Sequence, residues 1–181
     1  MNLPNRLTVI RVIMIPFFVF FMLTDAAGNA SKWIALFIFC AASFTDYLDG
    51  HIARKYNLIT NFGKFMDPLA DKLLVCSAFV CFVELSKLSA WIVIVIISRE
   101  FIISGFRLVA CDKGVVIAAS IYGKFKTVTQ MAMIILLIID IADPVYILVT
   151  KAVTYIALIM TVVSLADYLI KNKDVMKEAQ G

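Results

Sequence analysis

Four aspartates in otherwise apolar sequence are the residues of this chain best suited to chemistry. Asp46 and Asp49 form one pair, and Asp67 and Asp71 form another. On helices, about 100° per residue separates the first two side chains by about 60° and the last two by about 40°. Each pair then makes a single carboxylate face. Clustered carboxylate oxygens are hard ligands that suit Mg²⁺ or Mn²⁺, with one or two ions in such a site.

The connection between the two pairs is short and polar, which limits how their helices are arranged. Residues 55–61 leave room only for a tight turn, so we expect two antiparallel neighbours with all four carboxylates at one end. Asp49 then lies roughly 9 Å from the turn and Asp71 roughly 15 Å. A bare anion at that depth in lipid costs at least about 2.5 kcal/mol, so cations or a wet cavity are required. A solvated face or helix caps explain one such pair, but not two converging pairs.

Composition indicates a membrane protein. Hydrophobic residues make up 62% of the 181 residues, and the mean hydropathy is +0.95. Soluble domains contain about 45–50% apolar residues. At about 20 residues per span, the chain has room for six spans and for no separate soluble domain. We therefore expect one membrane domain over residues 1–181, with no cleavable signal peptide before the first span.

The predicted fold is all-α, with a short interfacial helix at the N-terminus followed by six transmembrane helices. Residues 2–15 mix polar and apolar side chains, as in a helix at the membrane surface, and Pro16 is expected to bend it into the first span. The first span is expected to end near Thr24. The later spans are expected at about residues 33–55, 62–85, 90–109, 123–140 and 145–170.

The distribution of Lys and Arg predicts the orientation. Most of them fall at one set of span ends, and only Lys32, Lys87 and Lys151 fall at the opposite set. Positive residues favour the cytoplasmic side. We therefore expect a multi-pass protein of the cytoplasmic membrane, with both termini and the aspartates on the cytoplasmic side. Membrane lipids are its expected surroundings, and no nucleic-acid partner is expected.

The fourth predicted span carries charged residues inside apolar sequence. Arg99 and Glu100 lie near its middle, and Arg107 lies toward its end. An internal ion pair between Arg99 and Glu100 that ties the helices together is one interpretation. Arg107 lies nearer to water and is better placed to meet a ligand.

Two lysines open the fifth predicted span. Lys124 and Lys126, together with backbone N–H groups at a helix start, are suited to bind a phosphate. They are equally typical of positive residues at a cytoplasmic span end. On a helix the two side chains point about 200° apart, so only one can face a given pocket. We favour Lys126.

The spacing of the aspartates resembles the complete signature of the CDP-alcohol phosphotransferase family, which are integral membrane enzymes of phospholipid synthesis. The matching positions are Asp46, Asp49, Gly50, Ala53, Arg54, Gly63, Asp67 and Asp71. The resemblance implies that the four aspartates hold two divalent cations, Mg²⁺ or Mn²⁺. Asp46 and Asp67 would bridge both ions, and Asp49 and Asp71 would each complete one. Asp71 would also be the general base.

The same resemblance implies where a CDP-linked lipid binds. Gly50, Arg54 and Thr60 would contact CDP-diacylglycerol. The family often begins with a pattern that Asn5, Thr8 and Arg11 match, and these residues would border the nucleotide site. Family resemblance also implies a homodimer.

The second half of the chain resembles the bacterial phosphatidylglycerophosphate synthase group of this family. The similar motifs are residues 99–101, 104–107 and 123–127. The resemblance implies glycerol 3-phosphate as acceptor, with its phosphate near Arg107, Lys124 and Lys126. The implied reaction converts CDP-diacylglycerol and glycerol 3-phosphate to phosphatidylglycerophosphate and CMP.

Two alternatives remain open at this point. One is a family member with another acceptor, such as inositol phosphate, serine or phosphatidylglycerol. The other is a divalent-cation transporter, which also places acids in its spans. The transporter hypothesis predicts cation flux without CMP release. It gives no role to Gly50, Ala53 and Arg54 at their fixed spacing from the aspartates.

Overall fold

A computed structural model describes residues 3–55, 61–112 and 120–172, and this part of the chain is helical throughout apart from short turns. Side chains are described except at residues 3–5, 46–55, 61–68 and 111–112. The elements are α1 (Leu3–Leu23), the 3₁₀ turn η1 (Gly28–Ala30), α2 (Ser31–Lys55), α3 (Asn61–Glu84), α4 (Ala90–Asp112), α5 (Ile121–Ile139) and α6 (Pro144–Lys171). The all-α prediction is confirmed, and helices α2 to α6 begin and end within a few residues of the expected spans.

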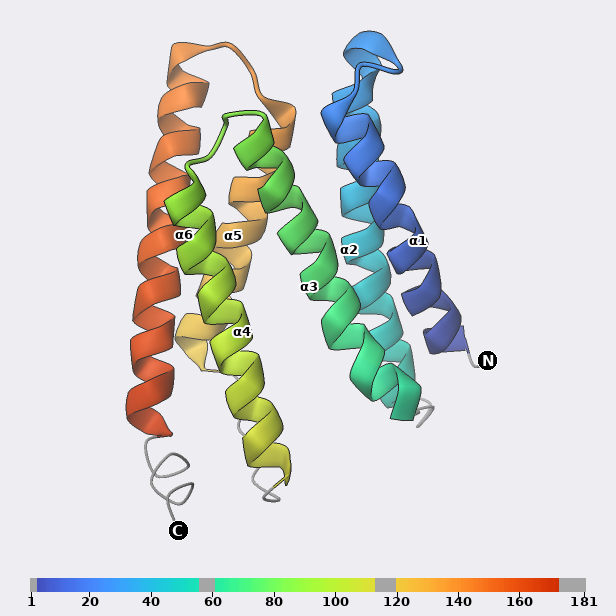
Figure 1. The fold of residues 1–181 in the computed structure, drawn as a ribbon, viewed down its shortest axis with the longest axis vertical. Helices are drawn as coiled ribbons and strands as arrows, with labels where there is room; N and C mark the ends of the chain where they lie inside the picture. The colour runs from blue at the N-terminus through green and yellow to red at the C-terminus, as the bar shows by residue number, and fades with distance from the viewer. Residues whose placement is uncertain (1–2, 56–60, 113–119, 173–181) are drawn as a thin grey trace. The chain divides into compact units, whose positions relative to one another are not determined.

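The chain divides into two compact units, Met1–Leu88 and Ser89–Gly181. In the first unit α1 packs along both α2 and α3, and in the second α6 packs along both α4 and α5 (Figure 1). Successive helices run in opposite directions within each unit. The prediction of one membrane domain over the whole chain stays a prediction.

The core of the first unit is built from aromatic and small side chains. Phe18 of α1 and Phe39 of α2 are fully buried, with ring centroids 5.8 Å apart. Ala35, Ala42 and Ala78 are also fully buried. Small residues let helix backbones approach closely, which is how helices associate where the surroundings are themselves apolar.

Three of the described helices are long and apolar enough to cross a membrane. They are α1 over Arg6–Leu23, α5 and α6. Large apolar side chains such as Phe37, Val80 and Leu148 are 72%, 61% and 68% exposed, which suits lipid and not water. The chain is therefore a membrane protein with several candidate spans. Charged residues inside α2, α3 and α4 lower their hydropathy, and the count of six spans stays a prediction.

The prediction of a separate interfacial helix at the N-terminus is wrong. Helix α1 continues from Leu3 to Leu23 with Pro16 inside it. Proline removes one backbone donor and crowds the preceding turn, but a helix can bend at such a residue without ending. The polar residues of the N-terminal segment therefore belong to the same helix as the first candidate span.

Local chemistry fixes the turns of the second unit. Asp140 caps the C-terminal end of helix α5: its φ of 46° is left-handed, and its N–H donates a hydrogen bond to the Leu136 carbonyl. Asp143 then caps α6, because its Oδ1 accepts hydrogen bonds from the N–H groups of Val145 and Tyr146 at 2.9 and 3.0 Å. Pro144 follows directly in the first turn, where its missing N–H costs nothing.

We predict that Asp143→Ala lowers the stability of the purified protein in detergent by about 1 kcal/mol, because two backbone donors lose their acceptor. In a chain of this size, that corresponds to a fall in melting temperature of about 2 to 4 °C. Asp143→Asn retains an acceptor oxygen and serves as the control. Equal melting temperatures for the two variants would contradict a capping role.

Candidate active site

The four aspartates lie on two adjoining helices of the first unit, as expected. Asp46 and Asp49 belong to the last turns of α2, and Asp67 and Asp71 belong to the first half of α3. Because α2 and α3 are consecutive and antiparallel, these stretches lie toward the same end of the unit (Figure 1).

Only one of the four carboxylates has a described position. Asp71 is partly buried on α3, and it takes part in an electrostatic or hydrogen-bonding contact. The side chains of Asp46, Asp49 and Asp67 lie outside the described residues. Within the described part of the chain, no three acidic, histidine or cysteine side chains gather as metal ligands would. The metal site therefore stays a prediction. What the structure confirms is that its four aspartates belong to two helices, α2 and α3.

Arg11 of the N-terminal pattern lies against α2 just before the aspartates. Thr8 and Arg11 are both completely buried in the first unit. Arg11 Nε donates a hydrogen bond to the Ala42 carbonyl at 3.2 Å, and the Thr45 hydroxyl donates to the same oxygen at 2.7 Å. Ala42 lies one turn before Asp46. Helix α1 is therefore tied by a buried guanidinium to the turn of α2 that leads into the carboxylates.

The other predicted CDP-lipid contacts cannot be placed at the level of side chains. Gly50 and Arg54 belong to the last turns of α2, and Asn5 belongs to the first turn of α1. Their side-chain positions, and Thr60 as a whole, lie outside the described residues. These four contacts stay predictions.

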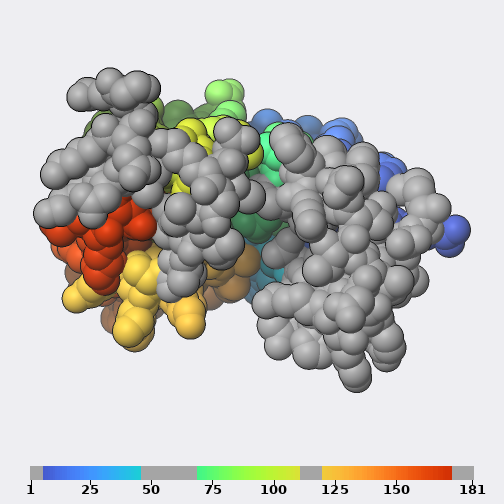
Figure 2. All heavy atoms as spheres, turned by 90° about the horizontal axis from the view of Figure 1, so that it is seen from below, coloured from blue at the N-terminus to red at the C-terminus, as the bar shows by residue number. Residues whose placement is uncertain are grey.

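The basic residues predicted for the acceptor site all belong to the second unit and differ in exposure. Arg107 on α4 and Lys124 on α5 are exposed, whereas Lys126 on α5 is 2% exposed at its side chain. The helical geometry that separates Lys124 from Lys126 is thus confirmed. The end of α6 and the start of α5 lie side by side at this end of the unit, as Figure 2 shows in red and yellow.

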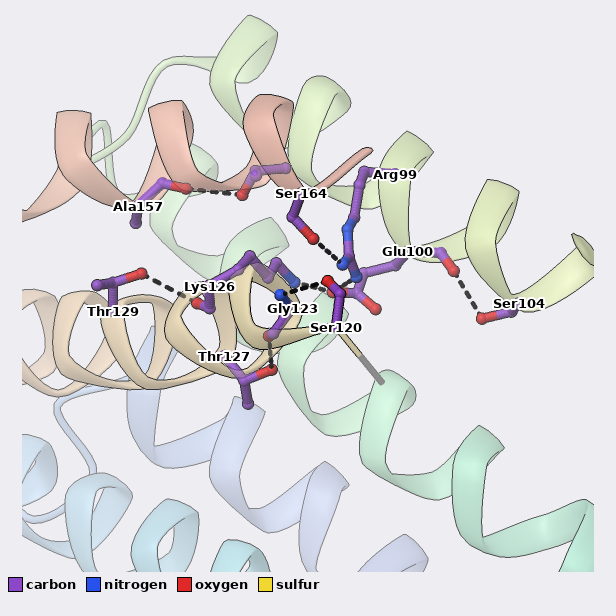
Figure 3. A network of polar contacts seen from close by, with 11 residues as sticks. Arg99, Glu100, Ser104, Ser120, Gly123, Lys126, Thr127, Thr129, Ala157 and Ser164 are labelled. Carbon is purple, nitrogen blue, oxygen red and sulfur yellow. Dashed lines mark hydrogen bonds and ion pairs between the residues drawn. The ribbon is translucent and has the colours of Figure 1, made fainter. Parts of the chain in front are cut away.

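A charged network surrounds Lys126 (Figure 3). The Lys126 ammonium donates a hydrogen bond to Glu100 Oε1, and Arg99 Nη1 lies 3.6 Å from the same oxygen. Arg99 Nη2 donates to the hydroxyl of Ser164 on α6. The ion pair that was one interpretation of Arg99 and Glu100 is present. Through these two residues α4 is linked to Lys126 of α5 and to Ser164 of α6.

Sequence reasoning missed two polar residues of this network. Ser164 is 1% exposed and accepts the Arg99 hydrogen bond, but one hydroxyl in an apolar helix carries no signal of its partner. Ser120 caps α5 by accepting a hydrogen bond from the Gly123 N–H at 3.1 Å. Serine is among the preferred N-cap residues. Ser120 therefore could have predicted from the sequence that this helix begins at Ile121 and not at Gly123.

Comparison with known proteins identifies the family to which these helices belong. Residues 1–163 match the profile of CDP-alcohol phosphatidyltransferases, which covers most of the chain. The chain belongs to the CDP-alcohol phosphatidyltransferase family. The resemblance seen in the aspartate spacing is therefore confirmed.

Within the family, several bacterial relatives are similar over nearly their full length. A CDP-diacylglycerol–glycerol-3-phosphate 3-phosphatidyltransferase of Bacillus subtilis is 42% identical over 192 aligned residues, which cover 97% of each chain. A probable phosphatidylglycerophosphate synthase of Mycobacterium tuberculosis is 36% identical, over 93% of this chain and 80% of the relative. A CDP-diacylglycerol–glycerol-3-phosphate 3-phosphatidyltransferase of Rickettsia typhi is 35% identical, over 92% of this chain and 94% of the relative.

Proposed function

We propose that this protein is a phosphatidyltransferase that converts CDP-diacylglycerol and glycerol 3-phosphate to phosphatidylglycerophosphate and CMP. The similarity to relatives with this named activity extends over both units. The observation that carries the proposal is the family signature at the adjoining ends of α2 and α3, within a chain whose family membership is established. The reaction class follows from the family, and the acceptor follows from the named relatives.

The donor set on α2 and α3 fits two divalent cations. Asp46 and Asp49 are three residues apart on α2, and Asp67 and Asp71 are four apart on α3, and this spacing predicts that each pair offers oxygens from one helix face. Carboxylate oxygens are the ligands that Mg²⁺ and Mn²⁺ prefer. Bound there, the ions would neutralise the pyrophosphate of CDP-diacylglycerol and stabilise the charge that develops on the entering and leaving oxygens.

Asp71 is the proposed general base. Its carboxylate accepts the proton of the attacking acceptor hydroxyl, and this requires hydrogen-bond reach to that group. The hydroxyl oxygen then forms a bond to the phosphorus that carries diacylglycerol, and the bond from that phosphorus to CMP breaks.

The remaining site assignments follow the same proposal. Gly50, Arg54 and Thr60, with Asn5 and Thr8, contact the CDP-lipid. Arg107, together with either Lys124 or Lys126, binds the phosphate of the acceptor, for which cationic side chains are chemically suited. Exposed Arg107 and Lys124 are accessible to a soluble ligand, whereas Lys126 is held in the ion pair with Glu100.

We also propose that the aspartates face the cytoplasm and that the enzyme is a homodimer. In the first unit, α1 begins and α2 ends at the same end of the unit, which is the end that carries the aspartates (Figure 1). The first turns of α1 contain Arg6, and the last turn of α2 contains Arg54 and Lys55. Basic residues gathered at one end support a cytoplasmic location for that end. A soluble nucleotide product then leaves directly into the cytoplasm.

The acceptor is tested by offering the purified protein CDP-diacylglycerol with glycerol 3-phosphate, inositol phosphate, serine and phosphatidylglycerol in competition. We expect phosphatidylglycerophosphate as the main product lipid, formed with an equal amount of CMP. A different product lipid would show that the enzyme uses another acceptor within the same family. Cation flux without CMP release would support the transporter alternative.

We predict that Asp71→Asn lowers kcat by at least about a hundredfold, because the amide cannot accept the acceptor proton. Binding of CDP-diacylglycerol should largely survive, since three other carboxylates remain. Turnover and binding are measured on the same preparation, with Asp143→Asn as a control outside the site. Near-normal turnover of the Asp71→Asn variant would show that Asp71 is not the general base.

We predict that Arg107→Ala raises KM for glycerol 3-phosphate about tenfold and leaves KM for CDP-diacylglycerol unchanged, because one charged contact to the acceptor is lost. Lys151→Ala, which removes an exposed cation near the start of α6, is the matched control. If the two variants have the same KM for glycerol 3-phosphate, the phosphate binds elsewhere.

A further inference from the structure

The backbone carbonyl of Ala42 on α2 accepts hydrogen bonds from two side chains. Arg11 Nε on α1 donates to this oxygen at 3.2 Å, and the hydroxyl of Thr45 on α2 donates to it at 2.7 Å. Arg11 and Ala42 are completely buried, and Thr45 is half-buried. One backbone oxygen therefore joins α1 to α2 in the interior of the first unit.

The same oxygen belongs to the helical turn that leads to Asp46. In an α-helix each carbonyl accepts the N–H of the residue four positions later, and for Ala42 that residue is Asp46. A carbonyl oxygen has two lone pairs for its donors. The side chains of Arg11 and Thr45 therefore share their acceptor with the backbone of the first aspartate of the signature.

Contacts of this kind influence the path of a helix. A threonine hydroxyl that bonds back to a carbonyl of the preceding turn often bends its helix, and so does a side chain that enters the ladder of backbone hydrogen bonds. The guanidinium of Arg11 comes from a neighbouring helix, so the geometry of this turn depends on α1 as well as on α2. The turn that carries Asp46 is thus held from outside its own helix.

Packing of α1 against α2 does not by itself require an arginine at this place. Phe18 and Phe39 already join the same two helices with fully buried aromatic rings. Apolar side chains of similar volume often stabilise a protein as much as buried charged ones do. A guanidinium supplies what an apolar side chain lacks, which is a rigid, planar set of donors that can fix a backbone oxygen in one place.

We infer that Arg11 is a positioning residue for the divalent metal site, and that it acts with Thr45 through the Ala42 carbonyl. The inference rests on the proposed function, in which Asp46 is one of the metal ligands. Groups that lie behind metal ligands orient them, and the loss of such a group commonly weakens metal binding by about ten- to a hundredfold. In this role Arg11 touches neither the ions nor the nucleotide.

The first test is binding of Mn²⁺ to the purified full-length protein in detergent, without substrates, measured by electron paramagnetic resonance of the free ion. Arg11→Met removes the Nε donor and keeps a long, unbranched side chain. We expect its dissociation constant for Mn²⁺ to rise about tenfold.

Phe18→Leu is the matched control for this test, because it weakens the contact between α1 and α2 two turns further along α1 and removes no hydrogen-bond donor. Its melting temperature should fall, and its dissociation constant for Mn²⁺ should stay unchanged. If Phe18→Leu weakens Mn²⁺ binding as much as Arg11→Met does, loss of packing explains both results and the inference is overturned.

The second test asks whether the effect of Arg11 passes through the Ala42 carbonyl, since Arg11 also takes part in at least one further interaction. Thr45→Val removes the other side-chain donor to this oxygen and should raise the dissociation constant for Mn²⁺ about threefold. Because both donors act on one oxygen, the double variant should bind Mn²⁺ more tightly than the product of the two single effects predicts. Effects that simply multiply would overturn the inference. Thr24→Val, which removes a hydroxyl bond to the Phe20 carbonyl at the other end of α1, is the control and should bind Mn²⁺ normally.

Turnover supplies a readout that a purely structural role would not change in the same way. With Mn²⁺ far above its dissociation constant, Arg11→Met should release CMP within about threefold of the unmodified rate, because excess ion fills a weakened site. A structural role would instead lower the melting temperature and the active fraction. A loss of turnover that excess Mn²⁺ does not restore would therefore overturn the inference.

The outcomes separate this inference from the function on which it rests. If the unmodified protein binds Mn²⁺ but forms no phosphatidylglycerophosphate, the proposed function fails. If it forms this product but Arg11→Met leaves the dissociation constant for Mn²⁺ unchanged, only the positioning role fails. Should Arg11→Met not fold, Thr45→Val leaves Arg11 in place, and an unchanged dissociation constant in that variant would equally overturn the inference.

Discussion

Charged side chains inside apolar helices are the constraint on which the rest of this structure depends. Such a charge is costly in lipid unless a counter-charge or water accompanies it. In the second unit the chain supplies the counter-charge itself, because Glu100 lies between Arg99 and Lys126. In the first unit we propose that divalent ions supply it to the aspartates of α2 and α3. The two units thus meet the same physical demand in different ways.

Much of the fold could be predicted because apolar runs alternate with short polar turns. Aspartate is a preferred N-cap residue and proline is favoured in the first turn of a helix, so Asp143 and Pro144 mark a helix start. Helix α6 begins there in the structure. The error at the N-terminus has a physical cause. Polar residues near the start and Pro16 suggested two helices, but proline in a helix removes one hydrogen bond and does not force the helix to end.

The site was predictable in part, for reasons that differ between residues. Spacing along one helix placed the aspartate pairs, and it predicted that Lys124 and Lys126 point in different directions, which agrees with their different exposure. Spacing does not show which helices face one another. The contact of Lys126 with Glu100, 26 residues away on another helix, and the choice of Ser164 as the partner of Arg99 therefore required the structure.

The central claim is that acidic side chains of α2 and α3 hold divalent ions for the transfer reaction. The most direct measurement is CMP release from CDP-diacylglycerol and glycerol 3-phosphate after exhaustive chelation, followed by the return of Mg²⁺ or Mn²⁺. The account predicts that release stops in the chelated protein and resumes when either ion is restored, while the protein stays folded throughout. Undiminished CMP release from folded, metal-free protein would contradict it.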